Sequence, residues 1–182
     1  MKKYLKRSAS GFTIIEVIIV LAIAGLIMLV VFLAVPQLQR NARDNSRRAI
    51  VTRLKSEIEN YASNNQGTYP LSSVGTCSSG TTGEWGDFYG RYISGAGLNI
   101  KDPSTGVAVI GCTPATSASS TTSYLYTAGG VPATLPGKKG VIAVIPGASC
   151  SGENVAASSG TNSYALIIGL DRDSTRYCID NG

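Results

Sequence analysis

The feature that most constrains this chain is a long uncharged segment close to its N-terminus. Val17–Val35 comprises nineteen residues without a charged side chain, and most of them are large and apolar. As an α-helix it would be about 28 Å long at about 1.5 Å per residue, close to the thickness of the hydrocarbon core of a bilayer. A helix that is apolar on every side has to be covered by lipid or by other helices. We therefore expect this segment to lie outside any water-soluble domain of the chain.

Basic residues lie immediately before the apolar segment. Residues 1–11 contain no acidic side chain and four positively charged ones: Lys2, Lys3, Lys6 and Arg7. By the positive-inside rule this end of the chain stays in the cytoplasm. A secretory signal peptide is the simplest alternative, and Ala22-Ile23-Ala24 has the small-x-small form of a cleavage site. Cleavage there would leave a hydrophobic N-terminus, so we favour a segment that is retained.

Glu16 is the unusual residue in this part of the chain. A carboxylate in a membrane helix costs roughly 2.5–3.5 kcal/mol near the bilayer centre and less near its edge. It therefore needs a partner or a function. A cut between Gly11 and Phe12 would create an α-amino group four residues before Glu16. That positive charge would be available to this carboxylate or to the carboxylate of a neighbouring chain.

The run Gly11-Phe12-Thr13-Ile14-Ile15-Glu16, after a basic leader and before an apolar stretch, resembles the prepilin signal of type IV pilins and type II secretion pseudopilins. Gly25 lies where many members of that family have a glycine. The resemblance implies that a prepilin peptidase cuts after Gly11 and N-methylates Phe12. It implies that Glu16 neutralises the Phe12 amine of an adjacent subunit, and that the apolar helices form the core of a homo-oligomeric filament. Assembly would depend on a separate platform and ATPase machinery.

One position departs from the family pattern. Many members carry a proline at the position of Leu33, whereas this chain has Pro36, three residues later. Proline removes a backbone donor and weakens the helix around it. We therefore take Gly25 and Pro36 as the helix-breaking positions, and expect any kink or melted segment near Pro36.

After Pro36 the apolar pattern becomes one-sided. Four residues fall on one helical face: Ile50, Leu54, Ile58 and Tyr61. Asn64–Gly67 predicts the end of the helix, with Gly67 beside its cap. We expect one helix over residues 12–63, with its second half packed against a domain.

Segment 36–55 is strongly basic. It holds Asp44 as its one acidic residue and six basic ones: Arg40, Arg43, Arg47, Arg48, Arg53 and Lys55. Three interpretations remain open, namely a solvated helix face beside the membrane, contact with acidic surfaces or lipid headgroups during assembly, and DNA binding. The last is the weakest, because no aromatic residues alternate with the arginines to stack on bases.

The C-terminal part has the pattern of a small β domain. Short β-branched or aromatic runs, bounded by Gly and Pro, predict strands at residues 107–110, 124–127, 141–145 and 164–168. We expect an α+β fold, in which the long helix packs on a small antiparallel sheet with disulfide-tied loops. The predicted division is a cleaved leader (1–11), a membrane or filament-core helix (12–35), its amphipathic continuation (36–66) and a globular domain (67–182).

Four cysteines allow three disulfide pairings. We favour Cys77–Cys112 and Cys150–Cys178, since each closes a local loop, although reduced, buried cysteines remain the alternative. The second pair would resemble the C-terminal disulfide loop of type IV pilins. Disulfides require an oxidising compartment, which places the domain outside the cytoplasm.

The sequence argues against an enzyme. It contains no histidine, no Walker loop, no nucleophile elbow and no dinucleotide fingerprint. We therefore predict no catalytic residue and no cofactor. Asp171 and Asp173 make a weak calcium candidate, but we favour a salt-bridged turn with Arg172 and Arg176.

These features favour a pilin, a subunit of a surface type IV pilus that supports adhesion, twitching motility or DNA uptake. Before assembly it would be a single-pass protein of the cytoplasmic membrane, with its C-terminal domain outside. A type II secretion pseudopilin is the first alternative, and a monomeric membrane-anchored binding module is the second. The Ser/Thr-rich loops at residues 72–83 and 113–123 favour the pilin. The Asp171/Asp173 pair favours the pseudopilin slightly, as does the run Gly67-Thr68-Tyr69-Pro70 after the first helix, which resembles that of major pseudopilins.

Mature protein should begin at an N-methylated Phe12, because the resemblance implies cleavage after Gly11. Intact-mass and N-terminal peptide mass spectrometry of protein extracted from membranes measures this directly. An intact leader, or a mature end near Gly25, would contradict the prepilin interpretation.

Overall fold

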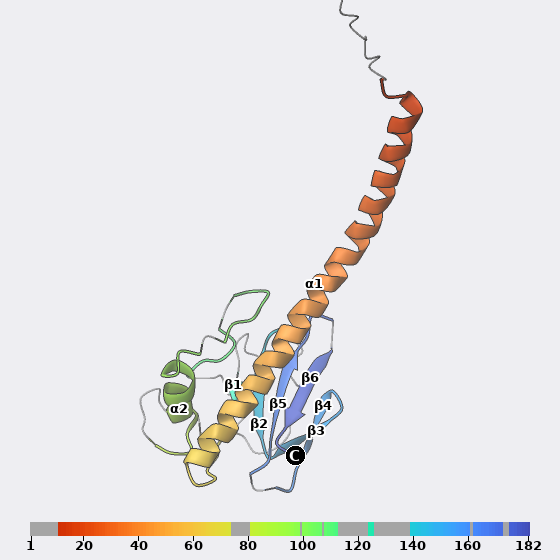
Figure 1. Ribbon diagram of the computed structural model, residues 1–182. Helices are drawn as coiled ribbons and strands as arrows, with labels where there is room; N and C mark the ends of the chain where they lie inside the picture. Colours follow the sequence, from red (N-terminus) through yellow and green to blue (C-terminus); the bar gives the residue numbers. More distant parts are fainter. Residues whose placement is uncertain are drawn as a thin grey trace, which may run out of the picture. The chain divides into compact units, whose positions relative to one another are not determined.

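The computed structural model describes residues 11–73, 81–98, 100–106, 108–112, 124–125, 139–160, 162–172 and 175–182. The α+β class predicted from the sequence is confirmed. Its helices are α1 (Ile14–Asn64), α2 (Trp85–Phe88) and the π-helical turn η1 (Tyr89–Ser94). Its strands are β1 (Tyr124–Leu125), β2 (Ile142–Pro146), β3 (Ala148–Ser151), β4 (Asn154–Ala157), β5 (Tyr164–Gly169) and β6 (Arg176–Asp180) (Figure 1). The chain divides into two compact units between Gln39 and Arg40, here called the N-terminal and C-terminal units.

In the N-terminal unit, the described residues form a helix that is apolar on all sides. Large apolar side chains from Phe12 to Leu38 are exposed. Since neighbouring residues of a helix point in different directions, their common exposure means that the apolar surface surrounds the helix. By length and composition, α1 is able to cross a membrane.

Neither Gly25 nor Pro36 interrupts the helix, so no melted segment is present at either position, and a kink near Pro36 stays a prediction. Both residues lie inside α1, which is assigned as one helix of 51 residues. Proline in a helix interior removes one backbone hydrogen bond and costs about 3 kcal/mol. The many backbone bonds on either side of Pro36 outweigh that local loss, so the helical conformation continues through it.

The C-terminal end of α1 has a Schellman-type cap. The backbone N–H of Gly67 donates to the carbonyl of Ala62 at 2.8 Å. Gln66 (φ 56°) and Gly67 (φ 81°) both adopt the left-handed conformation. The predicted place of Gly67 beside the cap is confirmed, but the first left-handed position belongs to Gln66. That conformation costs a non-glycine residue about 1–2 kcal/mol.

The main sheet has the strand order β1-β2-β5-β6. β2 and β5 pair antiparallel, with Val144 opposite Leu166, and β5 and β6 pair antiparallel, with Ile167 opposite Cys178. β1 pairs with β2 in parallel, which departs from the purely antiparallel sheet expected. β3 and β4 form a separate two-stranded hairpin.

Three of the four predicted strands correspond to β1, β2 and β5. The run 107–110 is not one of the named strands, since its pairing among the described residues is a single bridge from Ala108 to Lys101. Residues 126–127 of the predicted second strand lie outside the described residues. The sequence analysis missed β3, β4 and β6, which are short and whose small and polar residues form no clear alternating pattern.

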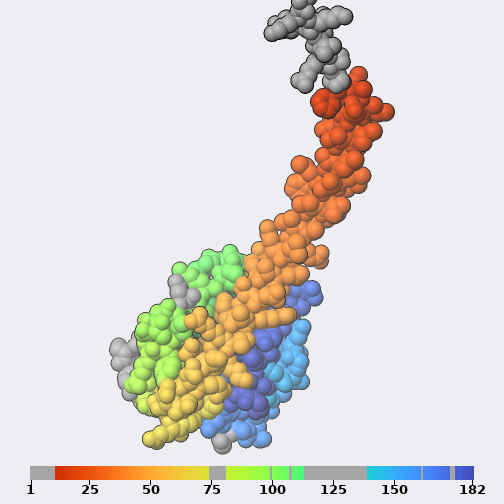
Figure 2. Space-filling view, in the orientation of Figure 1, coloured from red at the N-terminus to blue at the C-terminus, as the bar shows by residue number. Residues whose placement is uncertain are grey.

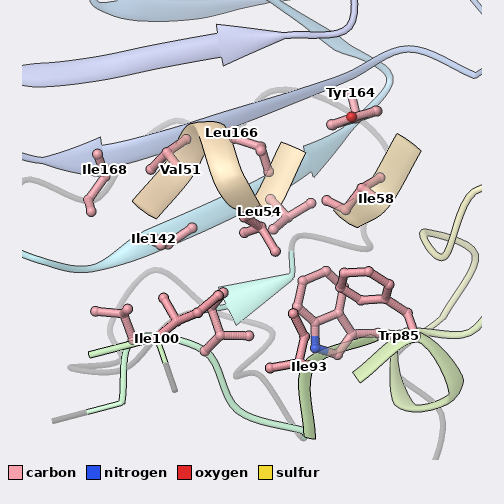
Figure 3. Packing of buried hydrophobic residues seen from close by; sticks show 14 of the residues in the cluster. Val51, Leu54, Ile58, Trp85, Ile93, Ile100, Ile142, Tyr164, Leu166 and Ile168 are labelled. Carbon is pink, nitrogen blue, oxygen red and sulfur yellow. The ribbon is translucent and has the colours of Figure 1, made fainter. Parts of the chain in front are cut away.

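One face of the sheet packs against the C-terminal half of α1. The helix contributes the predicted residues Leu54, Ile58 and Tyr61, together with Val51, and all four are fully buried. They lie with Ile142 of β2, with alternate residues of β5 and with Trp85 (Figure 3). Ile50, predicted for the same face, is partly buried at its margin. Figure 2 shows the outer side of this half of α1 on the surface of the C-terminal unit.

The other face of the sheet packs against the β3–β4 hairpin. Ala143 and Ile145 of β2 and Ile167 of β5 form a second cluster with Ala148 and Val155 of the hairpin. β2 and β5 are therefore covered on both faces. This explains why their sequences are continuous apolar runs and do not alternate.

Leu54→Ala should destabilise the C-terminal unit by about 2–5 kcal/mol, because the missing side-chain atoms leave a cavity in the larger core cluster. Chemical denaturation of the full chain in detergent, followed by circular dichroism, measures the change. Ser56→Ala, on the exposed side of the same helix turn, is the matched control. A loss below about 1 kcal/mol for Leu54→Ala would contradict this packing.

Candidate functional site

The first turn of α1 is closed by a reciprocal pair of polar side chains. The backbone N–H of Thr13 donates to Glu16 Oε2 at 2.8 Å, and the Thr13 hydroxyl donates to the same oxygen at 2.6 Å. In return, the backbone N–H of Glu16 donates to Thr13 Oγ1 at 3.4 Å. This is a capping box, in which a Thr at the N-cap and a Glu three residues later satisfy each other's backbone donors.

The capping box satisfies hydrogen bonds but does not neutralise charge. Both Thr13 donors are uncharged groups, so Glu16 keeps its full negative charge at the start of an apolar helix. The sequence analysis singled out Glu16 and missed Thr13. The spacing Thr-x-x-Glu just before an apolar run was the signal that would have found it.

The predicted processing residues lie beside this carboxylate. Phe12 is 91% exposed, and together with Glu16 it lines a hollow that is completed by Val17, Val20 and Leu21. Gly11 is exposed, and no atom lies within 4 Å of where a Cβ on it would be. Phe12 and Glu16 thus share one hollow at the N-terminal end of the helix.

The C-terminal unit contains a buried charge cluster centred on Arg47, whose side chain is 0% exposed. Arg47 Nε donates to Asp102 Oδ2 at 2.7 Å, and Nη1 donates to Asp171 Oδ1 at 2.8 Å. Nη2 donates to the Ser104 hydroxyl at 3.0 Å. Asp44, one turn earlier on α1, lies 3.3 Å from Nη1. The guanidinium therefore joins α1 to the loop at residues 102–104 and to Asp171, which lies just after β5.

Further contacts hold the two aspartates of the cluster in place. Asp102 Oδ1 accepts hydrogen bonds from the backbone N–H and the hydroxyl of Ser104. The backbone N–H of Asp171 donates to Asp44 Oδ1 at 2.6 Å. Gly140 (φ 72°) passes so close to Asp102 that a Cβ on it would clash with the carboxylate.

The cluster shifts the ionisation of its acids. Burial alone would raise the pKa of Asp102, but the hydrogen bonds from Arg47 and Ser104 outweigh burial and hold that pKa well below its usual range. Burial likewise opposes the effect of Arg47 and Arg43 on Asp171, whose pKa is also lowered. Both groups are therefore carboxylates at neutral pH.

Two expectations about charged residues are corrected by this cluster. Segment 36–55 is not uniformly a solvated basic face, because Arg47 is buried and Arg43 forms an ion pair with Asp171 at 2.7 Å. Asp171 does not form the expected turn with Arg172 and Arg176, since its carboxylate faces the arginines of α1.

The calcium candidate is weakened for the same reason. Asp171 already has a guanidinium group at each carboxylate oxygen, which makes it a poor ligand for a cation. Asp173, the other half of the candidate, lies outside the described residues. Among the described residues, no group of three or more acidic or cysteine side chains is arranged to hold a metal ion.

The remaining basic residues of segment 36–55 lie nearer to solvent. Arg40, Arg48 and Arg53 are exposed, and Lys55 is partly buried. The guanidinium of Arg48 lies 5.6 Å from the centroid of the Tyr177 ring, within range of a cation–π contact. The basic surface of α1 is therefore smaller than its composition suggests.

A disulfide joins the hairpin to the main sheet. Cys150 of β3 and Cys178 of β6 are bonded, with their Cα atoms 5.8 Å apart, as the sequence analysis favoured. Cys112 is also disulfide-bonded. Its predicted partner, Cys77, lies outside the described residues, so the Cys77–Cys112 pairing stays a prediction.

Arg47→Ala should destabilise the C-terminal unit by about 3–5 kcal/mol at pH 7, because it removes the guanidinium from the buried Asp102 carboxylate and one of the two arginines paired with Asp171. Arg53→Ala, an exposed arginine on the same helix, should change stability by less than about 0.5 kcal/mol. Denaturation of the full chain in detergent measures both. Equal effects of the two substitutions would contradict a structural role of the cluster.

The stability of the native chain and that of Arg47→Ala should also depend differently on pH. The lowered pKa values of Asp102 and Asp171 stabilise the native chain above their unfolded pKa, about 3.9, and this contribution is lost as pH falls through the folded values. In Arg47→Ala, Asp102 loses the guanidinium that lowers its pKa, so burial raises the pKa of this carboxyl and acid relieves the defect. The stability difference between native chain and variant should therefore shrink as pH is lowered from about 7 to about 3. A difference that is independent of pH would show that lost packing, not unpaired charge, causes the defect.

Comparison with known proteins agrees with the geometry at the helix N-terminus. A family model described as the prokaryotic N-terminal methylation motif matches residues 6–32, a segment that includes Gly11, Phe12 and Glu16. No curated protein and no solved structure matches the chain. The prepilin-type signal inferred from the sequence is confirmed by this match. The chain therefore carries, at its N-terminal end, the class III signal that is found in type IV pilins and pseudopilins.

Proposed function

We propose that this chain is a pilin, a structural subunit of a type IV pilus filament. A prepilin peptidase cuts it between Gly11 and Phe12 and methylates the new amine. The apolar half of α1 anchors the subunit in the cytoplasmic membrane and then packs against other copies in the filament core. The C-terminal unit lies outside the cytoplasm throughout and ends on the surface of the fibre.

The observation that carries this proposal is the position of Glu16. Glu16 lines one hollow with Phe12, the residue after the proposed cut, and lies within an apolar, exposed helix. The capping box leaves its charge uncompensated, and no basic side chain follows it in the sequence before Arg40. The free amine of a second subunit supplies the missing positive charge, so pairing favours stacking of one helix beside the next. A monomeric anchored module that keeps its leader offers no free amine at Phe12.

Two features favour a pilus over a secretion pseudopilin. The calcium argument for a pseudopilin depended on a free Asp171, and this carboxylate is occupied by Arg43 and Arg47. The Cys150–Cys178 disulfide ties the hairpin to the sheet, which suits a subunit exposed to mechanical load and to an oxidising environment. The pseudopilin remains the alternative, supported by the run Gly67-Thr68-Tyr69-Pro70 after α1, which resembles that of major pseudopilins.

The partners of the proposed pilin are other copies of the chain, the prepilin peptidase and a separate assembly platform with its ATPase. Nucleic acid is not among them in this proposal. The exposed arginines of α1 are few, and the aromatic ring beside Arg48 is already in contact with that arginine.

Electron microscopy of surface-sheared material, with the fibre protein identified by peptide mass, tests the proposal. Cells expressing the native chain should shed fibres that contain it. Glu16→Ala should leave membrane insertion intact and should strongly reduce the amount of chain in the sheared fraction, because the amine of the neighbouring subunit loses its counter-charge.

The matched control is Ser56→Ala, which lies outside the apolar half of α1 and should shed fibres normally. Normal fibres from Glu16→Ala would remove the charge-pairing argument. Native chain that forms short fibres inside the envelope, with none in the sheared fraction, would favour the pseudopilin.

A further inference from the structure

A groove of about 440 Å³ lies in the C-terminal unit where α1 ends. Its walls come from three parts of the chain, namely the segment 66–72 after the helix, the turn at Pro146–Gly147 between β2 and β3, and Asn162–Ser163 just before β5. Residues that are far apart in the sequence thus meet around one hollow. It is separate from Glu16 and from the Arg47 cluster, which share none of its residues.

The lining of this groove is polar and uncharged. None of the lining residues carries a charge, and six have amide or hydroxyl side chains: Gln66, Thr68, Tyr69, Ser72, Asn162 and Ser163. Among the described residues, the side chains of Gln66, Thr68 and Asn162 have no hydrogen-bond partner, and all three are exposed. Each amide offers both a donor and an acceptor to a molecule in the groove.

An aromatic ring completes the lining. The Tyr69 hydroxyl donates to Glu59 Oε2 at 2.9 Å, and its ring centroid lies 5.5 Å from that of Tyr164. The ring is therefore held in one orientation before any ligand arrives. Leu71 and Pro146 add further apolar surface to the same walls.

Backbone strain is present at the edge of the groove. Gln66 is the one non-glycine residue with a positive φ among the described residues. A glycine would adopt this conformation without cost, and it is the usual residue at this position of a helix cap. The Gln66 side chain compensates for the strain neither by burial nor by a hydrogen bond within the described chain. Strained residues of this kind cluster at ligand sites, where the side chain has a use that the fold does not require.

We infer that this groove binds a neutral saccharide unit. The absence of charge in its lining disfavours anions and cations, whereas paired amides and hydroxyls match the neighbouring hydroxyl groups of a sugar. A fixed aromatic ring and small apolar surfaces suit the C–H faces of a pyranose. The volume lies within the range of small-ligand pockets and exceeds that of one sugar ring. The inference does not depend on whether the chain builds a pilus or a secretion fibre.

Saturation-transfer NMR on the full chain in lipid nanodiscs tests the inference. The probes are the methyl glycosides of glucose, galactose, mannose and N-acetylglucosamine, each titrated up to about 10 mM, since weak single-site binding has a Kd near 1 mM. We expect saturable transfer from at least one of them. No saturable transfer from any of the four would overturn the inference.

Two variants separate the groove from the rest of the surface. Gln66→Gly and Asn162→Ala should each weaken binding about tenfold, the effect of losing one or two hydrogen bonds. Gln66→Gly should at the same time leave Tm unchanged or raise it by about 2–4 °C, because it relieves the strained backbone. Loss of binding in a protein that is as stable as the native chain excludes misfolding as the cause.

The matched control is Asn60→Ala, which removes an exposed amide from α1 outside the groove. It should bind the glycoside like the native chain. Binding that is unchanged in Gln66→Gly and Asn162→Ala, or that falls equally in Asn60→Ala, would place the sugar elsewhere and would contradict the inference.

Discussion

The guanidinium of Arg47 is the contact on which the arrangement of the C-terminal unit depends. It is fully buried, and its three nitrogens bond to the side chains of Asp102, Ser104 and Asp171. A buried cation is costly to remove from water, so it is tolerated only where carboxylates and hydrogen bonds replace its hydration. Because these partners come from two loops that are distant in sequence, the charge of one helix residue fixes where both loops lie against α1. The larger apolar cluster lies between α1 and the sheet.

The two halves of α1 have the same backbone conformation but distribute their apolar side chains differently. In the N-terminal unit the apolar side chains surround the helix, so the surface that covers them has to come from lipid or from other copies. In the C-terminal unit they form one face, and the sheet covers that face. The sheet is covered in turn by the β3–β4 hairpin on its other side, and the Cys150–Cys178 disulfide fastens the hairpin to β6. The backbone N–H groups of Thr13 and Glu16 at the start of the helix are satisfied locally, because each donates to the side chain of the other residue.

Local patterns in the sequence were sufficient for the elements whose residues repeat regularly. The helix came within two residues of its observed ends, since Leu54, Ile58 and Tyr61 share one face and Gly67 follows its cap. β2 and β5 were found because they are dense in β-branched residues. The strands β3, β4 and β6 were missed, because their burial depends on their packing against other strands. Sequences this short do not show which strands they will pack against. Thr13 is different, since its signal is local: the Thr-x-x-Glu spacing before an apolar run is typical of a capping box.

The membrane-compatible helix, the prepilin-type signal with Glu16 and the α+β class can all be predicted from the sequence, because each follows from residues that are neighbours in the chain or repeat along it. Which basic residues are buried or paired, and which residues line the groove, follows only from the tertiary structure. Six basic residues within a short helical segment look alike in composition, yet one is buried among aspartates and another is paired with Asp171. Likewise Gln66 and Asn162 are unremarkable polar residues until folding brings them to one hollow. Ion pairs and grooves depend on distances between segments that are far apart in sequence, and those distances exist only after the chain has packed.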